Sequence, residues 1–192
     1  LMWLFVGFVV AFSFWYIVLQ DANLFNAQIG TYCAINSPND MEKCVDGYSF
    51  EKLNPTGAAT KKLWFLSILS NNVYVMIFTL IFSLIFGAGA IFVLAWNASV
   101  IAAAIGVFTK YQLSEIPFGI LRYMVHGLPE IAAYFITALA GGIFGAGFIR
   151  HGLRDERFFR VAENAVILLF ASLILLLAAA TLEVYLTPFL FG

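Results

Sequence analysis

The sequence predicts an all-α protein, a polytopic bundle of five membrane-spanning helices. Of its 192 residues 62% are apolar and 11% are charged, whereas a water-soluble domain has about 25% charged residues. Long apolar runs without period-2 alternation separate the clustered charges, and in lipid only helices or closed barrels satisfy the backbone. A net charge of −1 offers no attraction to polyanions, so the composition argues against a nucleic-acid-binding protein as well as a soluble enzyme.

Each predicted span has about the 20 helical residues that a crossing needs. Residues 1–19 carry no charge and lack the basic start and small-residue cleavage site of a signal peptide. Residues 63–109 are uncharged and too long for one crossing, so they predict a hairpin that turns at Gly87 and Gly89. A turn at residues 96–97 is the alternative, and it leaves the second arm short. The five predicted spans are residues 1–19, 63–86, 91–110, 128–149 and 161–186.

Prolines mark the limits of the later spans. Residues 114–123 contain Pro117 and predict an interfacial segment rather than a span. Pro129 then falls in the first turn of the fourth span, where its missing N–H is harmless. Pro188 closes the fifth span.

The positive-inside rule predicts the orientation of the bundle. The short connection between the fourth and fifth spans holds two acids and four arginines, namely Arg150, Arg154, Arg157 and Arg160. We therefore place this connection and the N-terminus in the cytoplasm and the C-terminus outside. Residues 1–192 then form a single multi-pass domain in the cell membrane, with residues 20–62 as an extracytoplasmic loop.

The two cysteines of the chain, Cys33 and Cys44, both fall in this outer loop. Disulfides persist in oxidising compartments, so the pair predicts a disulfide, which adds about 3 kcal/mol of stability for a loop of this size. Free thiols are the alternative. A metal site is disfavoured because two cysteines supply half a zinc site and the loop has no histidine.

Amide and ionisable side chains inside a span are costly, at about 2.5–3.5 kcal/mol for a charge at the centre. The predicted topology gathers most of them near the outer ends of three spans. One interpretation is a polar pocket in which His126 and Glu130, four residues apart, bind a cation, a proton or a lipid headgroup. The other is hydrogen bonding that joins helices, which explains asparagines better than a His–Glu pair. The candidate residues are Asn71, Asn72, Asn97, Arg122, His126, Glu130 and Glu183.

The sequence predicts no catalytic residue, no metal site and no cofactor. The run from His126 to Glu130 lacks the two histidines one turn apart that a zinc protease needs. His151 lies on the predicted cytoplasmic face and cannot share an ion with His126. Glu183, close to an interface, is expected to be solvated.

Small residues recur along the fourth span and predict a surface for close helix packing. We expect its partner on residues 102–106 of the same chain, and contact between two copies is the alternative. The helix-packing residues are Gly141, Gly142, Gly145 and Gly147, with Gly87 and Gly89 at the hairpin.

The order of these motifs resembles the stage II sporulation protein M family of integral membrane proteins, over nearly the whole chain. The motifs are Asn71-Asn72, Gly87-Ala-Gly89, Asn97, His126-Gly-Leu-Pro-Glu130 and Gly145-Ala-Gly147. The resemblance implies five spans and a role beside other envelope proteins. It implies no chemistry for His126 or Glu130.

We therefore expect a non-enzymatic scaffold or subunit of a cell-envelope complex. The alternative is a transporter, a channel or a lipid-handling protein that uses the polar cluster, and an intramembrane enzyme is the least favoured class. The expected partners are the lipid bilayer, other envelope proteins and, through small-residue helix faces, a second copy of the chain. Nucleic acid is not expected as a partner.

The predicted orientation can be tested with two reporter tags. A tag after Arg154 should report the cytoplasm and a tag after Asp46 the opposite side of the membrane, because three of the five predicted spans, an odd number, lie between these positions. If both tags report one side, the hairpin at Gly87 is miscounted.

The predicted disulfide can be tested by alkylation. In protein purified without reductant, a thiol reagent added before reduction should label neither Cys33 nor Cys44, and after reduction it should label both. Labelling of both thiols before reduction would contradict the disulfide and weaken the orientation.

Overall fold

The computed structural model describes residues 2–18, 26–36, 61–86, 90–109 and 116–191, and every element within them is helical. Helices lie in all five predicted spans. In chain order the elements are α1 (Met2–Val18), α2 (Asn26–Asn36), α4 (Lys61–Phe86), α5 (Ala90–Thr109), α6 (Ile116–His151), α7 (Glu156–Thr181), the π-helical turn η4 (Leu182–Leu186) and α8 (Thr187–Phe191).

Among the described residues, three helices are long and apolar enough to cross a membrane. They are Trp64–Phe86, Leu121–His151 and Glu156–Leu190, and shorter apolar helices lie at Trp3–Trp15 and Ile91–Ile105. The all-helical prediction is confirmed for the described residues, whereas the count of five spans stays a prediction.

The later helices are longer than the sequence predicted. α6 begins at Ile116, so the expected interfacial segment is helical from that residue, and Pro129 lies inside the helix. The predicted place of Pro129 in the first turn was wrong, because a proline removes only one helical hydrogen bond and lipid offers the remaining backbone groups no alternative partner. Whether residues 116–123 lie at the interface stays a prediction. The last helix likewise continues beyond Leu186, and Pro188 lies in the first turn of α8, where its missing N–H is tolerated.

The described part of the predicted outer loop contains a helix that was not predicted from the sequence. This helix is α2, in which Ile29 and Cys33 are buried. Cys44 lies outside the described residues, so the disulfide stays a prediction. The hairpin glycines Gly87 and Gly89 also lie outside them.

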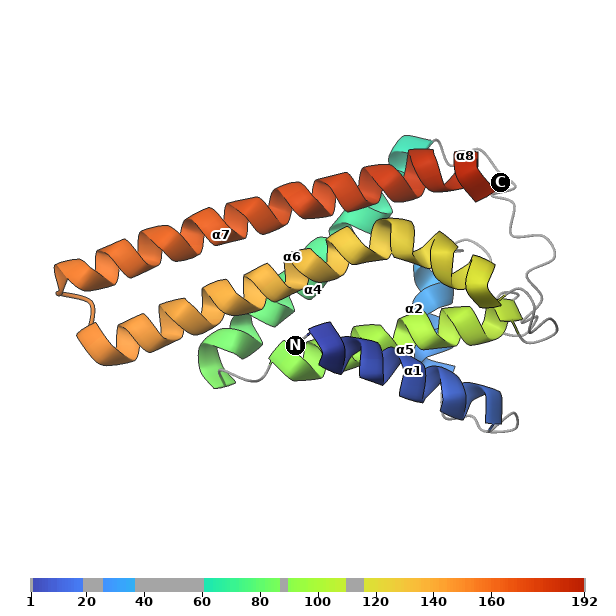
Figure 1. Cartoon of the computed structure of the whole chain (residues 1–192). Coiled ribbons are helices and arrows are strands. Elements are labelled where there is room, and N and C mark those ends of the chain that lie inside the picture. The colour runs from blue at the N-terminus through green and yellow to red at the C-terminus, as the bar shows by residue number, and fades with distance from the viewer. Residues whose placement is uncertain (1, 19–25, 37–60, 87–89, 110–115, 192) are drawn as a thin grey trace. The chain divides into compact units, whose positions relative to one another are not determined.

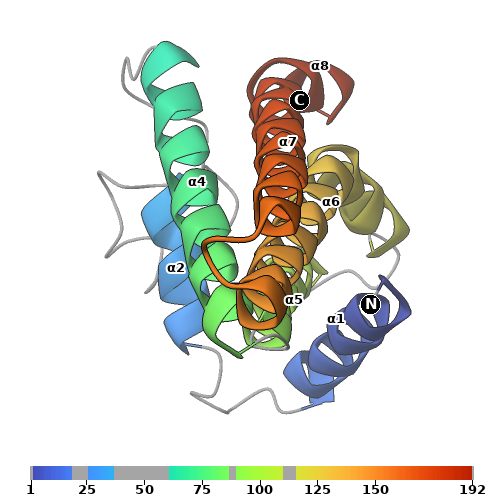
Figure 2. The same cartoon turned by 90° about the vertical axis from the view of Figure 1, so that its left-hand side faces the viewer.

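The chain divides into two compact units, residues 1–67 with 95–124 and residues 68–94 with 125–192. In the first unit the buried side chains include Phe5 on α1 and a run of alanines on α5, namely Ala98, Ala102, Ala103 and Ala104. The second unit combines most of α4 with α6, α7, η4 and α8, and these helices lie side by side (Figures 1 and 2).

Glycines bring α4 and α6 of the second unit into close contact. A Cβ added at Gly141 would lie 3.0 Å from the carbonyl oxygen of Leu80, and one added at Gly145 would lie 3.0 Å from that of Leu84. The Ser83 hydroxyl also donates a hydrogen bond to the Ala138 carbonyl oxygen. Within the second unit, the nearest atoms to both glycines thus lie on α4. A small-residue stripe specifies close approach but not its partner.

Two further contacts fix α7 against α6. The Thr137 hydroxyl donates to Ser172 Oγ over 3.0 Å, and both side chains are fully buried. Nearer the connection between the helices, the Phe144 and Phe158 rings meet edge to face with centroids 5.3 Å apart. The hydrogen bond between the Thr137 and Ser172 hydroxyls contributes about 0.6–2 kcal/mol to the association of the two helices.

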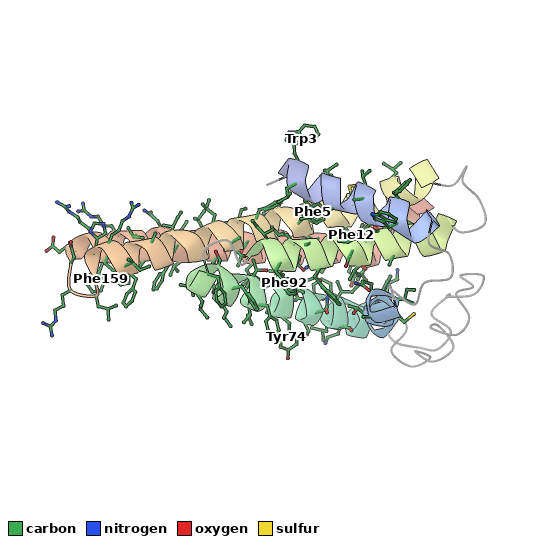
Figure 3. All side chains as sticks on the ribbon, turned by 90° about the horizontal axis from the view of Figure 1, so that it is seen from below. Trp3, Phe5, Phe12, Tyr74, Phe92 and Phe159 are labelled. Carbon is green, nitrogen blue, oxygen red and sulfur yellow. The ribbon has the colours of Figure 1, made fainter. Side chains whose placement is uncertain are left out.

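The outward faces of the second unit are apolar. Tyr74 on α4 is 64% exposed and points away from the bundle (Figure 3). Other large apolar side chains exposed on α4 and α7 include Ile77, Phe78, Ile81, Ile85, Phe86, Phe159, Val166, Ile167, Phe170, Ile174 and Leu177. In water this surface would be unfavourable, whereas in a bilayer it faces acyl chains.

The close contact between α4 and α6 predicts the effect of adding one methyl group. Gly145→Ala should lower the free energy of unfolding by about 1–3 kcal/mol, because its Cβ would meet the backbone oxygen of Leu84, which cannot move aside without separating the helices. The measurement is unfolding of the purified protein in mixed detergent micelles.

Gly142→Ala is the matched control on the same helix. Its Cβ would lie 3.7 Å from Ser83 Oγ, an ordinary contact, and alanine favours the helix by about 1 kcal/mol. Equal destabilisation by the two variants would contradict the close packing of Gly145.

Candidate functional site

Glu130 on α6 forms the centre of a polar group inside the second unit. The hydroxyl of Tyr134, one turn further along α6, donates a hydrogen bond to Glu130 Oε1 over 2.8 Å. Tyr134 is fully buried, so its hydroxyl requires an acceptor, and Glu130 supplies one at the i,i+4 spacing that places both on one helix face.

Two asparagines of α4 lie on the other side of Glu130. Asn71 Nδ2 donates to Asn72 Oδ1 over 3.3 Å, which leaves Asn72 Nδ2 as the remaining polar atom of that amide. The Asn72 side chain is 3% exposed and is directed at the Glu130 carboxyl. Its Nδ2 nevertheless makes no hydrogen bond of normal length within the described part of the chain. A buried donor left in this state costs about 1–3 kcal/mol.

Glu183 brings a second carboxyl to this group. It lies in the π-helical turn η4, within electrostatic range of both Glu130 and Tyr134. The ranges 68–94, 125–149 and 161–191 contain no lysine or arginine that would balance two negative charges. The expectation that Glu183 is solvated stays a prediction: the residue is half-buried, in a helix that continues through η4 instead of ending there.

His126 lies one turn before Glu130 and contacts the last helix. Its Nδ1 is 3.4 Å from the hydroxyl oxygen of Thr187, and that hydroxyl donates to the Leu182 carbonyl oxygen over 3.1 Å. Thr187 is buried, so this contact ties the start of the second unit's α6 segment to the end of η4.

We define the acidic pair as Glu130 and Glu183. Of the residues singled out from the sequence, Asn71 and Asn72 lie beside this pair, and His126 is joined to the same helix end through Thr187. Asn97 and Arg122 belong to the first unit.

The sequence analysis missed Tyr134 and Thr187. Each follows a predicted site residue by four positions, Tyr134 after Glu130 and Thr187 after Glu183, so helical spacing was the signal that would have found them.

The side chains of this polar group limit the chemistry that it can perform. Among the described residues, no three His, Cys, Asp or Glu side chains come together in a way that would hold a metal ion. The group offers two carboxyls, a tyrosine hydroxyl and an amide donor without a partner. Carboxyls inside membrane segments are typical of proton relays and ion pathways.

Comparison with known proteins gives one clear result. Neither the curated proteins nor the solved structures yield a match. The model of the family described as Stage II sporulation protein M matches residues 2–188, nearly the whole chain. Together with its apolar helices, this match shows that the chain is an integral membrane protein that belongs to the stage II sporulation protein M family.

Proposed function

We propose that this chain is a membrane transport protein, or the transport subunit of an envelope complex, and that it moves protons by way of the acidic pair. The observation that carries the proposal is that Glu130 and Glu183 lie within electrostatic range of each other in a bundle whose neighbouring helix segments hold no basic residue. Two adjacent carboxylates in a medium of low dielectric repel each other strongly, so the pair needs a bound cation or a proton. A scaffold has no use for such a costly arrangement.

The hydrogen-bond donors around Glu130 favour a proton over a metal cation. Tyr134 donates to Glu130, and the unpartnered Nδ2 of Asn72 is directed at the same carboxyl. A metal ion requires oxygen ligands and is repelled by an N–H group on its open side. Donors instead support one negative charge on the pair, with the other carboxyl holding the exchangeable proton.

The position of Glu130 along α6 supports access to water from one side. Arg150 is twenty residues further along the same helix, a rise of about 30 Å, close to the thickness of the hydrocarbon core. With Arg150 among the cytoplasmic headgroups, Glu130 lies near the outer boundary. This placement rests on the five-span topology with N-terminus in and C-terminus out, which we retain as part of the proposal.

The π-helical turn also supports a functional role for Glu183. Runs of π-helix are rare and often occur at functional sites, because the wider register leaves backbone groups that can change partners. In this chain the turn spans Leu182–Leu186 and carries Glu183 itself.

A scaffold in an envelope complex is the second candidate. The folded helix α2 inside the predicted outer loop favours it, because a structured segment outside the membrane can serve as a docking surface. Crosslinking from α2 to another envelope protein would support this role, which is compatible with proton transport by the same chain.

The proposed function predicts proton flux in proteoliposomes. With a pH gradient and a potassium diffusion potential, wild-type protein should acidify the lumen, as followed by a pH-sensitive dye. Glu130→Gln and Glu183→Gln should each reduce the rate at least tenfold, because each replaces a protonatable carboxyl with an amide of similar shape. The fold should persist in Glu130→Gln, since the glutamine carbonyl still accepts the Tyr134 hydrogen bond.

Glu163→Gln is the matched control, since it removes an exposed carboxyl from α7 and should leave the flux unchanged. Thermal unfolding of each variant shows whether it is folded. Wild-type protein without proton flux, or a folded Glu130→Gln variant with full flux, would contradict the proposal.

A further inference from the structure

The connection between α6 and α7 has a conformation fixed by its own backbone. Gly152 adopts a left-handed conformation with φ of 66°, and its N–H donates to the Phe148 carbonyl oxygen over 2.9 Å, which ends α6. Asp155 then caps α7, because its Oδ1 accepts a hydrogen bond of 2.9 Å from the Arg157 backbone N–H. The short turn is therefore held in place without any arginine side chain.

Within the described residues, the arginine side chains of this turn make no hydrogen bond and no ion pair. We define the basic turn as Arg150, Arg154, Arg157 and Arg160, all of which are exposed. The one ion pair that the structure has at this connection joins His151 Nδ1 to Asp155 Oδ2 over 3.4 Å. The Arg157 backbone N–H, helped by the charges of His151 and Arg157, holds the pKa of Asp155 below its usual value, so this acid stays bound at the cap.

Exposed apolar side chains alternate with the arginines. Ile149 is 84% exposed, Leu153 is 62% exposed and Phe159 is 63% exposed. The neighbouring Phe158 ring is buried against Phe144 and Phe148 and anchors the turn. Figure 3 shows Phe159 at this end of the bundle, where nitrogen-tipped side chains extend in several directions.

Exposed arginines beside exposed apolar side chains fit one chemical environment, the surface of an anionic bilayer. Apolar side chains enter the region of the acyl chains, while guanidinium groups beside them reach the phosphates. Guanidinium groups bind phosphate oxygens in pairs of hydrogen bonds, and a turn that is already ordered loses little entropy on binding. An acidic protein segment would satisfy the charges but not the exposed isoleucine and phenylalanine.

We propose that the basic turn is a binding site for the headgroups of anionic phospholipids, with Arg154 and Arg157 as the central phosphate ligands. The site lies at the opposite end of the α6–α7 pair from the acidic pair (Figure 1), and it does not depend on proton transport. Bound lipid holds this end of the bundle at the membrane surface and thereby fixes the depth of both helices.

Native mass spectrometry of the full chain in detergent tests the site directly. Titration with phosphatidylglycerol should show tighter binding than titration with phosphatidylcholine, by about tenfold or more, since each arginine near an anionic surface contributes about a factor of five. The double variant Arg154→Gln/Arg157→Gln should lose this preference. Raised salt should weaken binding of phosphatidylglycerol to the wild type.

Three controls separate the outcomes. Lys61→Gln/Lys62→Gln also removes two exposed positive charges, from the start of α4, and should keep the preference. Arg154→Lys/Arg157→Lys keeps the charge but not the paired hydrogen bonds and should bind with intermediate affinity. Inorganic phosphate should not displace the lipid, because it lacks the acyl chains that contact the apolar side chains.

Several results would overturn the proposal. These are equal binding of the two lipids, a preference that survives in Arg154→Gln/Arg157→Gln, a preference lost in Lys61→Gln/Lys62→Gln, and displacement by inorganic phosphate. Thermal unfolding in phosphatidylcholine nanodiscs confirms that each variant is folded, since the exposed arginines make no contact that the fold needs.

Discussion

The close approach of α4 and α6 is the constraint on which the rest of the second unit depends. Gly141 and Gly145 lie so near the carbonyl oxygens of Leu80 and Leu84 that no side chain fits between the two backbones. Contacts at this distance fix the register, since a shift of one turn would place a bulky residue where a glycine is needed. The same register brings Asn72, further back along α4, opposite Glu130 on α6.

The return of α7 adds a second register that runs in the opposite direction. Going back along α6 from Gly147 to Thr137 and Glu130, the partners on the last helix advance from Val161 to Ser172 and Glu183. The acidic pair is thus the outcome of many ordinary packing contacts rather than of a local motif. The glycine contacts, the buried hydroxyls and the Phe144 and Phe158 rings hold the helices in place. The unit can therefore contain the acidic pair, which is unfavourable by itself.

The two ends of the α6–α7 pair differ in the sign and the exposure of their charged side chains. At one end, two half-buried carboxyls lie between helices, near a tyrosine hydroxyl and an amide. At the other end, four arginines are exposed, and Asp155, one of the two acids between them, is occupied by the helix cap. Membrane proteins commonly place basic residues at headgroup level and bury few acids, so the acidic pair is the feature that requires a functional explanation.

The sequence by itself determined the helical membrane class and the positions of the main helices, and it singled out Asn71, Asn72, His126 and Glu130 as polar residues inside spans. Each of these follows from local patterns, namely apolar runs of spanning length and polar side chains that lipid does not solvate. The sequence did not predict the helix α2 in the outer loop. It also did not predict that α6 continues through Pro129, because the cost of the lost hydrogen bond depends on what the rest of the helix contacts.

Only the tertiary structure decided which groups meet. The spacing of Gly141 and Gly145 predicted close packing, but the choice of α4 as partner depends on how the chain returns through the bundle. Glu183 was expected at the end of the last span, and it lies within electrostatic range of Glu130 on a helix that continues through a π-helical turn. Residues more than fifty positions apart carry no mutual signal in a single sequence, since their contact is set by the packing of whole helices.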